Sequence, residues 1–215
     1  DSGITKLEDL KGKKLGFADP DSTSGYLVPL VTLPEAIGGP VKEFFGETGF
    51  GGGHENLVLE VVKGTFDAGT TFGSGVGEWK DGYTSSNLHK MVEKGILDMN
   101  DLVELWKSPL IPADPMVYRK DLSPELKKKI QTFFVNYGKG ADAAREKQIL
   151  ATLTYQGFRP SSDAQLVPIR QIELAKEKAK IETDTTLAAA DKEKKLADVT
   201  RRLADLDKAA ATTQQ

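Results

Sequence analysis

The chain has 215 residues, of which 39% are hydrophobic and 28% are charged, and its formal net charge is −3. This length allows one large or two modest domains, with enough apolar material for a core. The negative balance argues against a nucleic-acid-binding protein, and no apolar run reaches the roughly 18 residues of a membrane span. There is no cysteine and there are two histidines, which excludes disulfides and thiol nucleophiles and argues against a histidine-ligated metal.

The first half of the chain predicts strands that alternate with helices. Its predicted elements are a short helix from a capping box at Thr5 and Glu8 to Gly12, strands over 14–18 and 66–72, helices over 25–37 and 54–63, and a glycine-rich turn over 46–53. This rhythm indicates an α/β sheet with helices on its faces.

The second half is richer in helix. It predicts strands over 102–106 and 116–118 and helices over 123–138, 141–153 and 168–180, with a last helix after 183–186. In that last helix the apolar residues Leu196, Val199, Leu203, Leu206 and Ala210 are spaced 3, 4, 3 and 4 apart. Such a stripe fits either a helix packed on its own domain or a dimerising arm.

A run of three hydroxyl side chains lies between the strand at 14–18 and the helix that follows. Ser22, Thr23 and Ser24 precede Gly25, where the apolar helical pattern begins. The first N–H groups of a helix lack partners and carry the positive end of its dipole, so this position attracts anions. Simple capping needs only one such residue. The sequence lacks the Lys-Ser/Thr ending of a nucleotide-binding P-loop, and a small phosphoryl-like anion is the leading candidate.

Three further residues can carry chemistry, and each also has a structural interpretation. His54 begins a helix after three glycines and could donate to an anion, or could be structural. Asp114, between two prolines, could form a turn or receive an ammonium group. Glu78 lies in a glycine-rich loop, where exposure to solvent is the default. No Ser-His-Asp set or carboxylate pair stands out, so hydrolytic machinery is not visible.

Five stretches together resemble one family. They are ADPDSTSGYLVP (18–29), GHENLVLEVVKGTFDAGTT (53–71), WKSPLIPADPMVYRKDLS (106–123), FFVNYG (133–138) and SSDAQLVPIRQIEL (161–174). They look like segments of the phosphonate-binding proteins of bacterial ABC importers. The resemblance implies an α/β, periplasmic-binding-protein-like fold of type II with two lobes, here with the N-terminal part of lobe 1 missing and with a C-terminal helical tail.

The resemblance implies roles for individual residues. Ser22, Thr23 and Ser24 match the hydroxyl cluster that the family places on the phosphonate oxygens. His54 matches its phosphonate-contacting histidine. Asp114 falls where the family places a carboxylate for the amino group of 2-aminoethylphosphonate.

The family's second ammonium-binding acid is expected near Ser74, which is not an acid. Glu78 follows four residues later. Either Glu78 substitutes through a shifted loop, or selectivity for an amine is weakened.

The resemblance also implies a division of the chain. Residues 1–106 would form the second lobe with its anion-binding turns, 107–175 the C-terminal part of the first lobe, and 176–215 a helical tail that could dimerise. The expected function is ligand capture in the periplasm for delivery to a membrane permease, without a cofactor and without catalysis. The protein would be exported, although no signal peptide is visible in this chain.

Two other function classes stay open from the residues alone. A phosphotransfer or hydrolytic α/β enzyme would show turnover and would need a nucleophile or a metal. A scaffold built on the C-terminal helices would dimerise with concentration and would not respond to ligand.

Overall fold

Two compact units make up the chain. The computed structural model describes residues 2–73, 76–153 and 155–213. The first unit comprises Asp1–Ile111 and Ile172–Thr200, and the second comprises Pro112–Gln171 and Arg201–Gln215. Among the described residues, no helix combines the length and the apolar character that crossing a membrane requires.

The first unit contains a parallel sheet of three strands. These are β1 (Lys14–Phe17), β2 (Glu47–Phe50) and β3 (Ala68–Gly69), in the order β2-β1-β3. Leu15 of β1 lies opposite Thr48 of β2 and Ala68 of β3. The first strand of the chain is therefore the central one, and the connection from β1 to β2 and the connection from β2 back to β3 run in opposite directions along the sheet.

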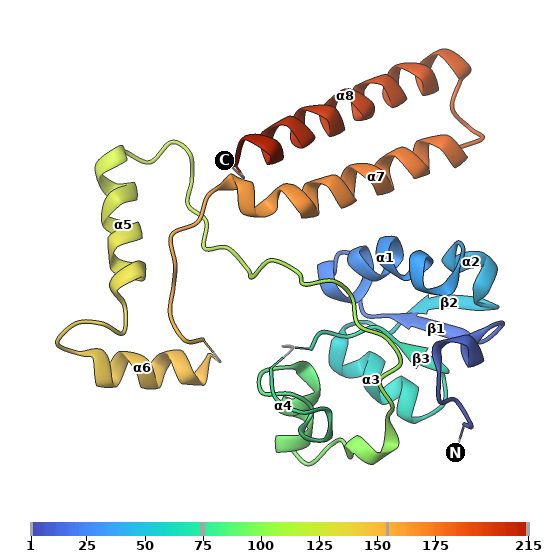
Figure 1. Ribbon diagram of the computed structural model, residues 1–215, viewed down its shortest axis with the longest axis horizontal. Helices are drawn as coiled ribbons and strands as arrows, with labels where there is room; N and C mark the ends of the chain where they lie inside the picture. Colours follow the sequence, from blue (N-terminus) through green and yellow to red (C-terminus); the bar gives the residue numbers. More distant parts are fainter. Residues whose placement is uncertain (1, 74–75, 154, 214–215) are drawn as a thin grey trace. The chain divides into compact units, whose positions relative to one another are not determined.

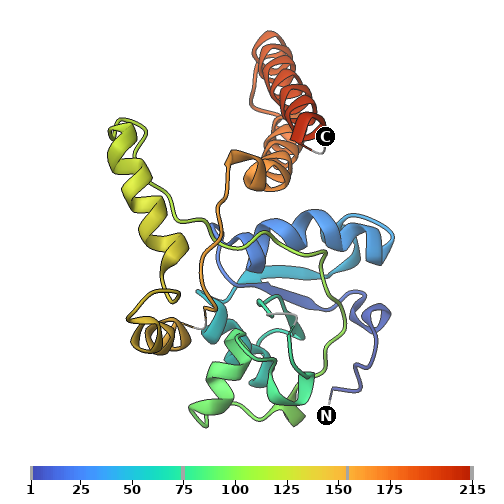
Figure 2. The same ribbon diagram turned by 60° about the vertical axis from the view of Figure 1, so that its left-hand side comes forward.

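Helices cover both faces of this sheet. The helices α1 (Val28–Ile37) and α2 (Val41–Phe44) lie on one face, and α3 (His54–Val62) lies on the other (Figures 1 and 2). Right-handed crossovers that run in opposite directions place their helices on opposite faces. In such open sheets, ligands bind outside the carboxyl ends of the strands, where the direction reverses.

Successive residues of the central strand β1 face the helices on opposite sides of the sheet. Leu15 and Phe17 are buried in one apolar cluster with Leu33 of α1 and Val41 of α2. Gly16 points the other way, where a Cβ would overlap the Leu57 side chain of α3. This is the period of two that a strand with both faces covered requires.

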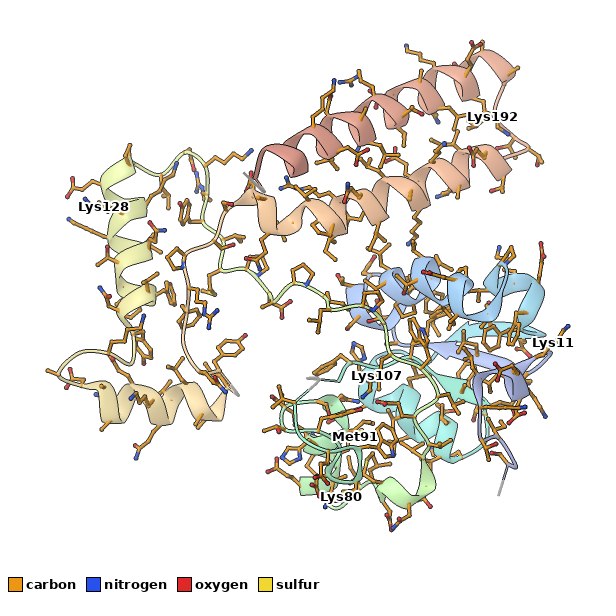
Figure 3. All side chains as sticks on the ribbon, viewed as in Figure 1. Lys11, Lys80, Met91, Lys107, Lys128 and Lys192 are labelled. Carbon is orange, nitrogen blue, oxygen red and sulfur yellow. The ribbon has the colours of Figure 1, made fainter. Side chains whose placement is uncertain are left out.

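A second apolar cluster lies beside α3. It contains Met91, which lies on α4 (Asn87–Glu93) and is fully buried. The other buried members are Val58, Leu88, Leu97 and Met99. The Met91 side chain is labelled in Figure 3. This packing holds α4 against α3 and so positions the chain that follows β3.

Two long helices close the chain, α7 (Val167–Thr183) and α8 (Ala189–Thr213). Within the first unit, residues 172–183 and 189–200 run side by side (Figures 1 and 2). The Lys192 ammonium donates to the carbonyl oxygens of Glu182 and Asp184, at 2.6 and 3.2 Å, and so caps the end of α7 (Figure 3). Val199 of the apolar stripe is 1% exposed, as expected for a helix packed on its own chain.

The second unit contains α5 (Pro124–Asn136) and α6 (Ala143–Thr152). Ser123 caps α5 as predicted, since its Oγ accepts from the Leu126 N–H at 3.2 Å. Phe133 of α5 is not buried in a core, since it is 57% exposed. That ring instead stacks edge-on to Phe134, with 5.2 Å between centroids.

Several sequence predictions need correction. The glycines of residues 46–53 predict a turn, but residues 47–50 form β2. Glycine suits that strand because Phe66 would crowd any Cβ at Gly49, at 3.1 Å. The strand predicted over 66–72 pairs only at Ala68–Gly69, and the described residues of 102–106 and 116–118 form no strand.

Two helix starts also differ from prediction. The first short helix, Leu7–Leu10, is capped from within, since the Asp9 carboxylate accepts from the N–H groups of Thr5 and Lys6. The predicted helix over 25–37 begins earlier, with a single π-helical turn at Thr23–Leu27 that leads into α1.

Candidate anion-binding site

The carboxyl ends of the three strands are hydrogen-bonded to one another. The Gly51 N–H donates to the Phe17 carbonyl at 2.8 Å, and the Gly53 N–H donates to the Ala18 carbonyl at 2.7 Å. On the other side, the Thr70 N–H donates to the Gly16 carbonyl at 3.1 Å. The loops that leave β1, β2 and β3 therefore begin at one common edge of the sheet.

The hydroxyl run forms the turn after β1. Ser22 caps it, because its Oγ accepts from the Gly25 N–H at 2.9 Å and its carbonyl accepts from the N–H groups of Tyr26 and Leu27. The N–H groups of Thr23 and Ser24 precede the first bonds of this turn, and no partner is assigned to them among the described residues. Two backbone donors and three hydroxyls thus lie at one helix start, as the sequence predicted for an anion site.

Gly25 is required in this turn by close packing. A Cβ at this position would overlap the Ala18 side chain, and would lie 2.8 Å from His54 Cε1 and 3.0 Å from Ser22 Oγ. Only a glycine allows the turn to approach both neighbours.

His54 lies against the hydroxyl turn. It is the first residue of α3, after Gly53 with φ of 117°, and its Nε2 lies 3.2 Å from Ser22 Oγ. Its Nδ1 lies 3.1 Å from Thr71 Oγ1, just after β3, and its ring meets Phe72 edge-on at 5.1 Å. Residues that follow all three strands therefore converge on one imidazole.

Burial lowers the pKa of His54 from its ordinary value of 6.5, and the nearby Asp19 carboxylate opposes this effect. The ring is consequently neutral at pH 7 in the free protein, with one N–H to donate. The hydroxyls, the backbone N–H groups and this ring provide hydrogen-bond donors without a fixed cation. Such a set suits an oxyanion, and the described residues contain no cluster of ligands for a metal.

Two polar residues at this edge were missed by the sequence predictions. Thr71 follows β3, and the Asn87 side chain donates from Nδ2 to Thr71 Oγ1 at 3.4 Å. Asn87 is 6% exposed, at the start of α4. The only signal in the sequence was a pair of threonines at the end of a predicted strand.

The remaining predicted residues do not join this group. Glu78 is exposed before the short helical turn Trp79–Asp81 and pairs with Lys80 at 2.9 Å. Asp114 is exposed and belongs to the second unit. Ser74 lies outside the described residues.

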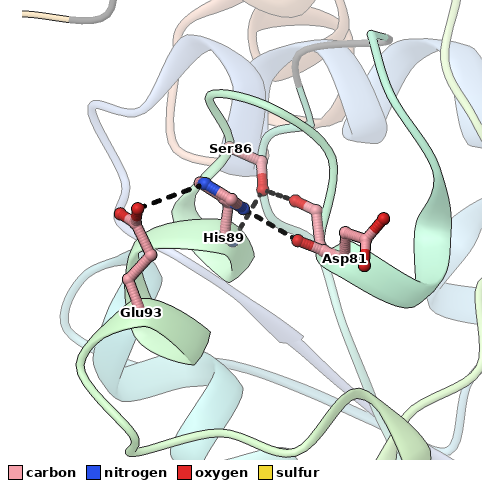
Figure 4. Close-up of polar contacts among 5 residues, drawn as sticks. Asp81, Ser86, His89 and Glu93 are labelled. Carbon is pink, nitrogen blue, oxygen red and sulfur yellow. Dashed lines mark hydrogen bonds and ion pairs between the residues drawn. The ribbon is translucent and has the colours of Figure 1, made fainter.

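His89 has a structural role. Its Nδ1 lies 2.8 Å from the Asp81 carbonyl, and its Nε2 lies 3.5 Å from a Glu93 oxygen (Figure 4). Ser86 caps the same helix by accepting from the His89 N–H at 3.1 Å. These contacts attach the turn Trp79–Asp81 to α4.

A parallel α/β sheet with hydrogen-bond donors gathered at the carboxyl ends of its strands is the arrangement at which open α/β sheets bind their ligands. A family model described as "ABC transporter, phosphonate, periplasmic substrate-binding protein" matches residues 1–166. The chain belongs to this family.

Two individual relatives agree with this family assignment. The chain is 37% identical to the phosphonates-binding periplasmic protein of Escherichia coli, over 97% of this chain and 58% of that protein. It is 33% identical to the phosphate-import protein PhnD of Mycolicibacterium smegmatis, over 62% of this chain and 40% of that protein. The matches thus span 58% of the length of the first relative and 40% of the length of the second.

A solved structure confirms the fold class. The binding-protein component of an ABC phosphonate transporter from Pseudomonas aeruginosa superimposes with a TM-score of 0.72 at 34% identity. The match covers 99% of this chain and 67% of the other. The fold is therefore periplasmic-binding-protein-like of type II with a C-terminal helical region, and its family consists of substrate-binding proteins and not of enzymes.

Proposed function

We propose that this chain is the ligand-capture component of an ABC importer and binds the anionic end of a phosphonate at the turn Ser22–Ser24 and His54. One observation carries the proposal: the Ser22 hydroxyl, the N–H groups of Thr23 and Ser24 and the His54 ring meet at the carboxyl edge of the sheet. Hydrogen bonds to a charged oxyanion are stronger than those between neutral groups. The family match supports this assignment.

The ligand is, in this proposal, a phosphonate that resembles 2-aminoethylphosphonate. Asp114 would receive the ammonium group, and Glu78 would take the place of the second acid. A carboxylate at that end would favour an amine and disfavour a fourth phosphate oxygen. Because one relative is named for phosphate import, selectivity between phosphonate and phosphate is the property to measure.

Titration calorimetry with 2-aminoethylphosphonate, methylphosphonate and inorganic phosphate tests both parts. We expect the aminophosphonate to bind tightest. Replacing Ser22 with alanine should weaken all three ligands by about tenfold, the loss of one charge-assisted hydrogen bond. Equal affinity for all three would retain the anion site and remove the role of Asp114.

A pair of variants separates the two carboxylates. Asp114→Asn should weaken only the aminophosphonate, whereas the effect of Glu78→Gln measures whether that residue substitutes for the missing acid. Both side chains are exposed, so neither change should affect folding. Absence of binding by every ligand would contradict the proposal for this chain.

We further propose that the protein acts in the periplasm and delivers its ligand to a membrane permease, with hinge motion near residues 1–5 and 107–112. One of the three points at which the chain passes between the units lies between Ile111 and Pro112, which supports the second of these locations for a hinge. Dimerisation through the C-terminal helices stays a prediction without support, because Val199 of the stripe is buried within the chain. Sedimentation equilibrium over a range of concentrations would test it.

A further inference from the structure

A chain of four polar side chains leads from the interior to the hydroxyl turn. Asn87 Nδ2 contacts Thr71 Oγ1 at 3.4 Å, Thr71 Oγ1 contacts His54 Nδ1 at 3.1 Å, and His54 Nε2 contacts Ser22 Oγ at 3.2 Å. The four residues come from four segments, which follow β1, β2 and β3 and begin α4. Each link is a hydrogen bond, so each has a donor and an acceptor.

The direction of the first link is set by chemistry. An amide nitrogen can only donate, so Asn87 gives a hydrogen to the Thr71 oxygen. The Thr71 hydroxyl is then free to give its own hydrogen to its other neighbour, His54 Nδ1. With Nδ1 as an acceptor, the single hydrogen of the neutral ring must be on Nε2.

The same direction continues to the hydroxyl turn. In this tautomer Nε2–H donates to Ser22 Oγ, which already accepts from the Gly25 N–H at 2.9 Å. With both acceptor positions occupied, Ser22 has its own O–H hydrogen left to donate. Hydrogen bonds that all run one way also polarise one another.

We propose that Asn87 and Thr71 are positioning residues that hold His54 as the Nε2–H tautomer, so that Ser22 presents its hydroxyl hydrogen to the anion and the site selects a fully deprotonated dianion. A protonated P–OH group would find no free acceptor on Ser22 or His54, so its hydrogen would have to be taken by the Thr23 or Ser24 hydroxyl or by the Asp19 carboxylate, whose charge acts on the ring. The choice of anion rests on the proposed function, whereas the tautomer can be measured without any ligand.

The test of the tautomer is nitrogen-15 NMR of the ring nitrogens in the full chain without ligand. The chain offers an internal reference, since His89 is its only other histidine. A carbonyl cannot donate, so His89 Nδ1, at 2.8 Å from the Asp81 oxygen, must carry the hydrogen in the neutral ring (Figure 4). We expect opposite tautomers for the two rings, and an Nδ1–H tautomer at His54 would overturn the proposal.

Variants test the role of each link. Asn87→Asp replaces a donor with an acceptor, and Thr71→Val removes the hydroxyl, so both deny His54 Nδ1 its donor. Each should move the ring away from the pure Nε2–H tautomer and weaken inorganic phosphate about tenfold. Thr71→Ser keeps the hydroxyl and should stay within about twofold. Thr71→Val introduces no charge, so agreement between the two variants excludes simple repulsion by the carboxylate that Asn87→Asp introduces.

The pH dependence tests the selection of a dianion. Sulfate stays a dianion across the pH range in which phosphate gains a proton, so the ratio of the two affinities cancels the titration of His54 itself. The phosphate-to-sulfate ratio should fall, approaching about tenfold per pH unit, below the second pKa of phosphate. A constant ratio would refute the selection. The wild-type chain could show the Nε2–H tautomer and yet bind no anion. That result would reject the proposed function but would leave the positioning of His54 intact.

Discussion

The hydroxyl of Thr70 donates a hydrogen bond to the carbonyl oxygen of Gly25 at 2.6 Å, across 45 residues of sequence. The same carbonyl accepts from the Ala18 N–H at 3.0 Å. One oxygen therefore joins the end of β3 to the turn after β1, and Thr70 is buried at this point. The position of the candidate anion site relative to the sheet depends on this junction.

Thr70→Val should loosen the junction without unfolding the protein. Valine has the same shape, and the Gly25 carbonyl keeps the bond from Ala18, so we expect a loss of about 1 kcal/mol in the free energy of unfolding. Urea denaturation measures it. Thr48→Val, on the exposed side of β2, is the matched control and should change little. Equal losses in both variants would show that the Gly25 bond contributes nothing specific.

Gly25→Ala should disturb the packing of the site more than the size of the added methyl group suggests. The new Cβ would overlap the Ala18 side chain and would lie 2.8 Å from His54 Cε1, so the turn must move away from the ring. Crowding of this kind costs about 1–3 kcal/mol. Gly39→Ala is the control, since nothing lies within 4 Å of its Cβ position. Thermal unfolding and phosphate titration of the two variants should differ, and a Gly25→Ala protein that behaved like Gly39→Ala would contradict the close packing.

His54 should make stability depend on pH. Burial lowers its folded-state pKa below 6.5, so below that pH the unfolded chain takes up a proton that the folded chain resists. Stability therefore falls as the pH decreases from about 6.5 towards the folded-state pKa, and this contribution is absent above that range. Unfolding free energies of the wild type and His54→Gln, compared from pH 5 to 8, isolate the effect. A difference between the two proteins that is constant over this range would contradict it.

Anion binding should draw a proton onto the same ring. A bound oxyanion favours the imidazolium form and raises the pKa of His54, against the effect of burial. Calorimetric titrations with sulfate near pH 6, in buffers of different ionisation enthalpy, should show fractional proton uptake that disappears near pH 8. His54→Gln should show no uptake at either pH. Uptake that persisted in this variant would place the proton on another group.

The sequence alone predicted the local elements with strong patterns. The strand at Lys14–Phe17 and the helix from His54 are confirmed, because apolar periodicity and the glycines around a turn are properties of the neighbouring chain. It also predicted a candidate anion turn at Ser22–Ser24, since three hydroxyls after a strand and before a helix form a local signal. The family itself was evident from short stretches spread along the chain.

Only the tertiary structure decided which distant residues meet. The glycines around Gly49 predict a turn, but Gly49 belongs to a strand because Phe66 fills the space of its missing side chain. Thr71 and Asn87 gave almost no signal, since the importance of Thr71 comes from its contact with His54, 17 residues earlier, and that of Asn87 from its contact with Thr71. Parallel pairing brings the ends of separate strands to one edge, and no local pattern records which side chains share it.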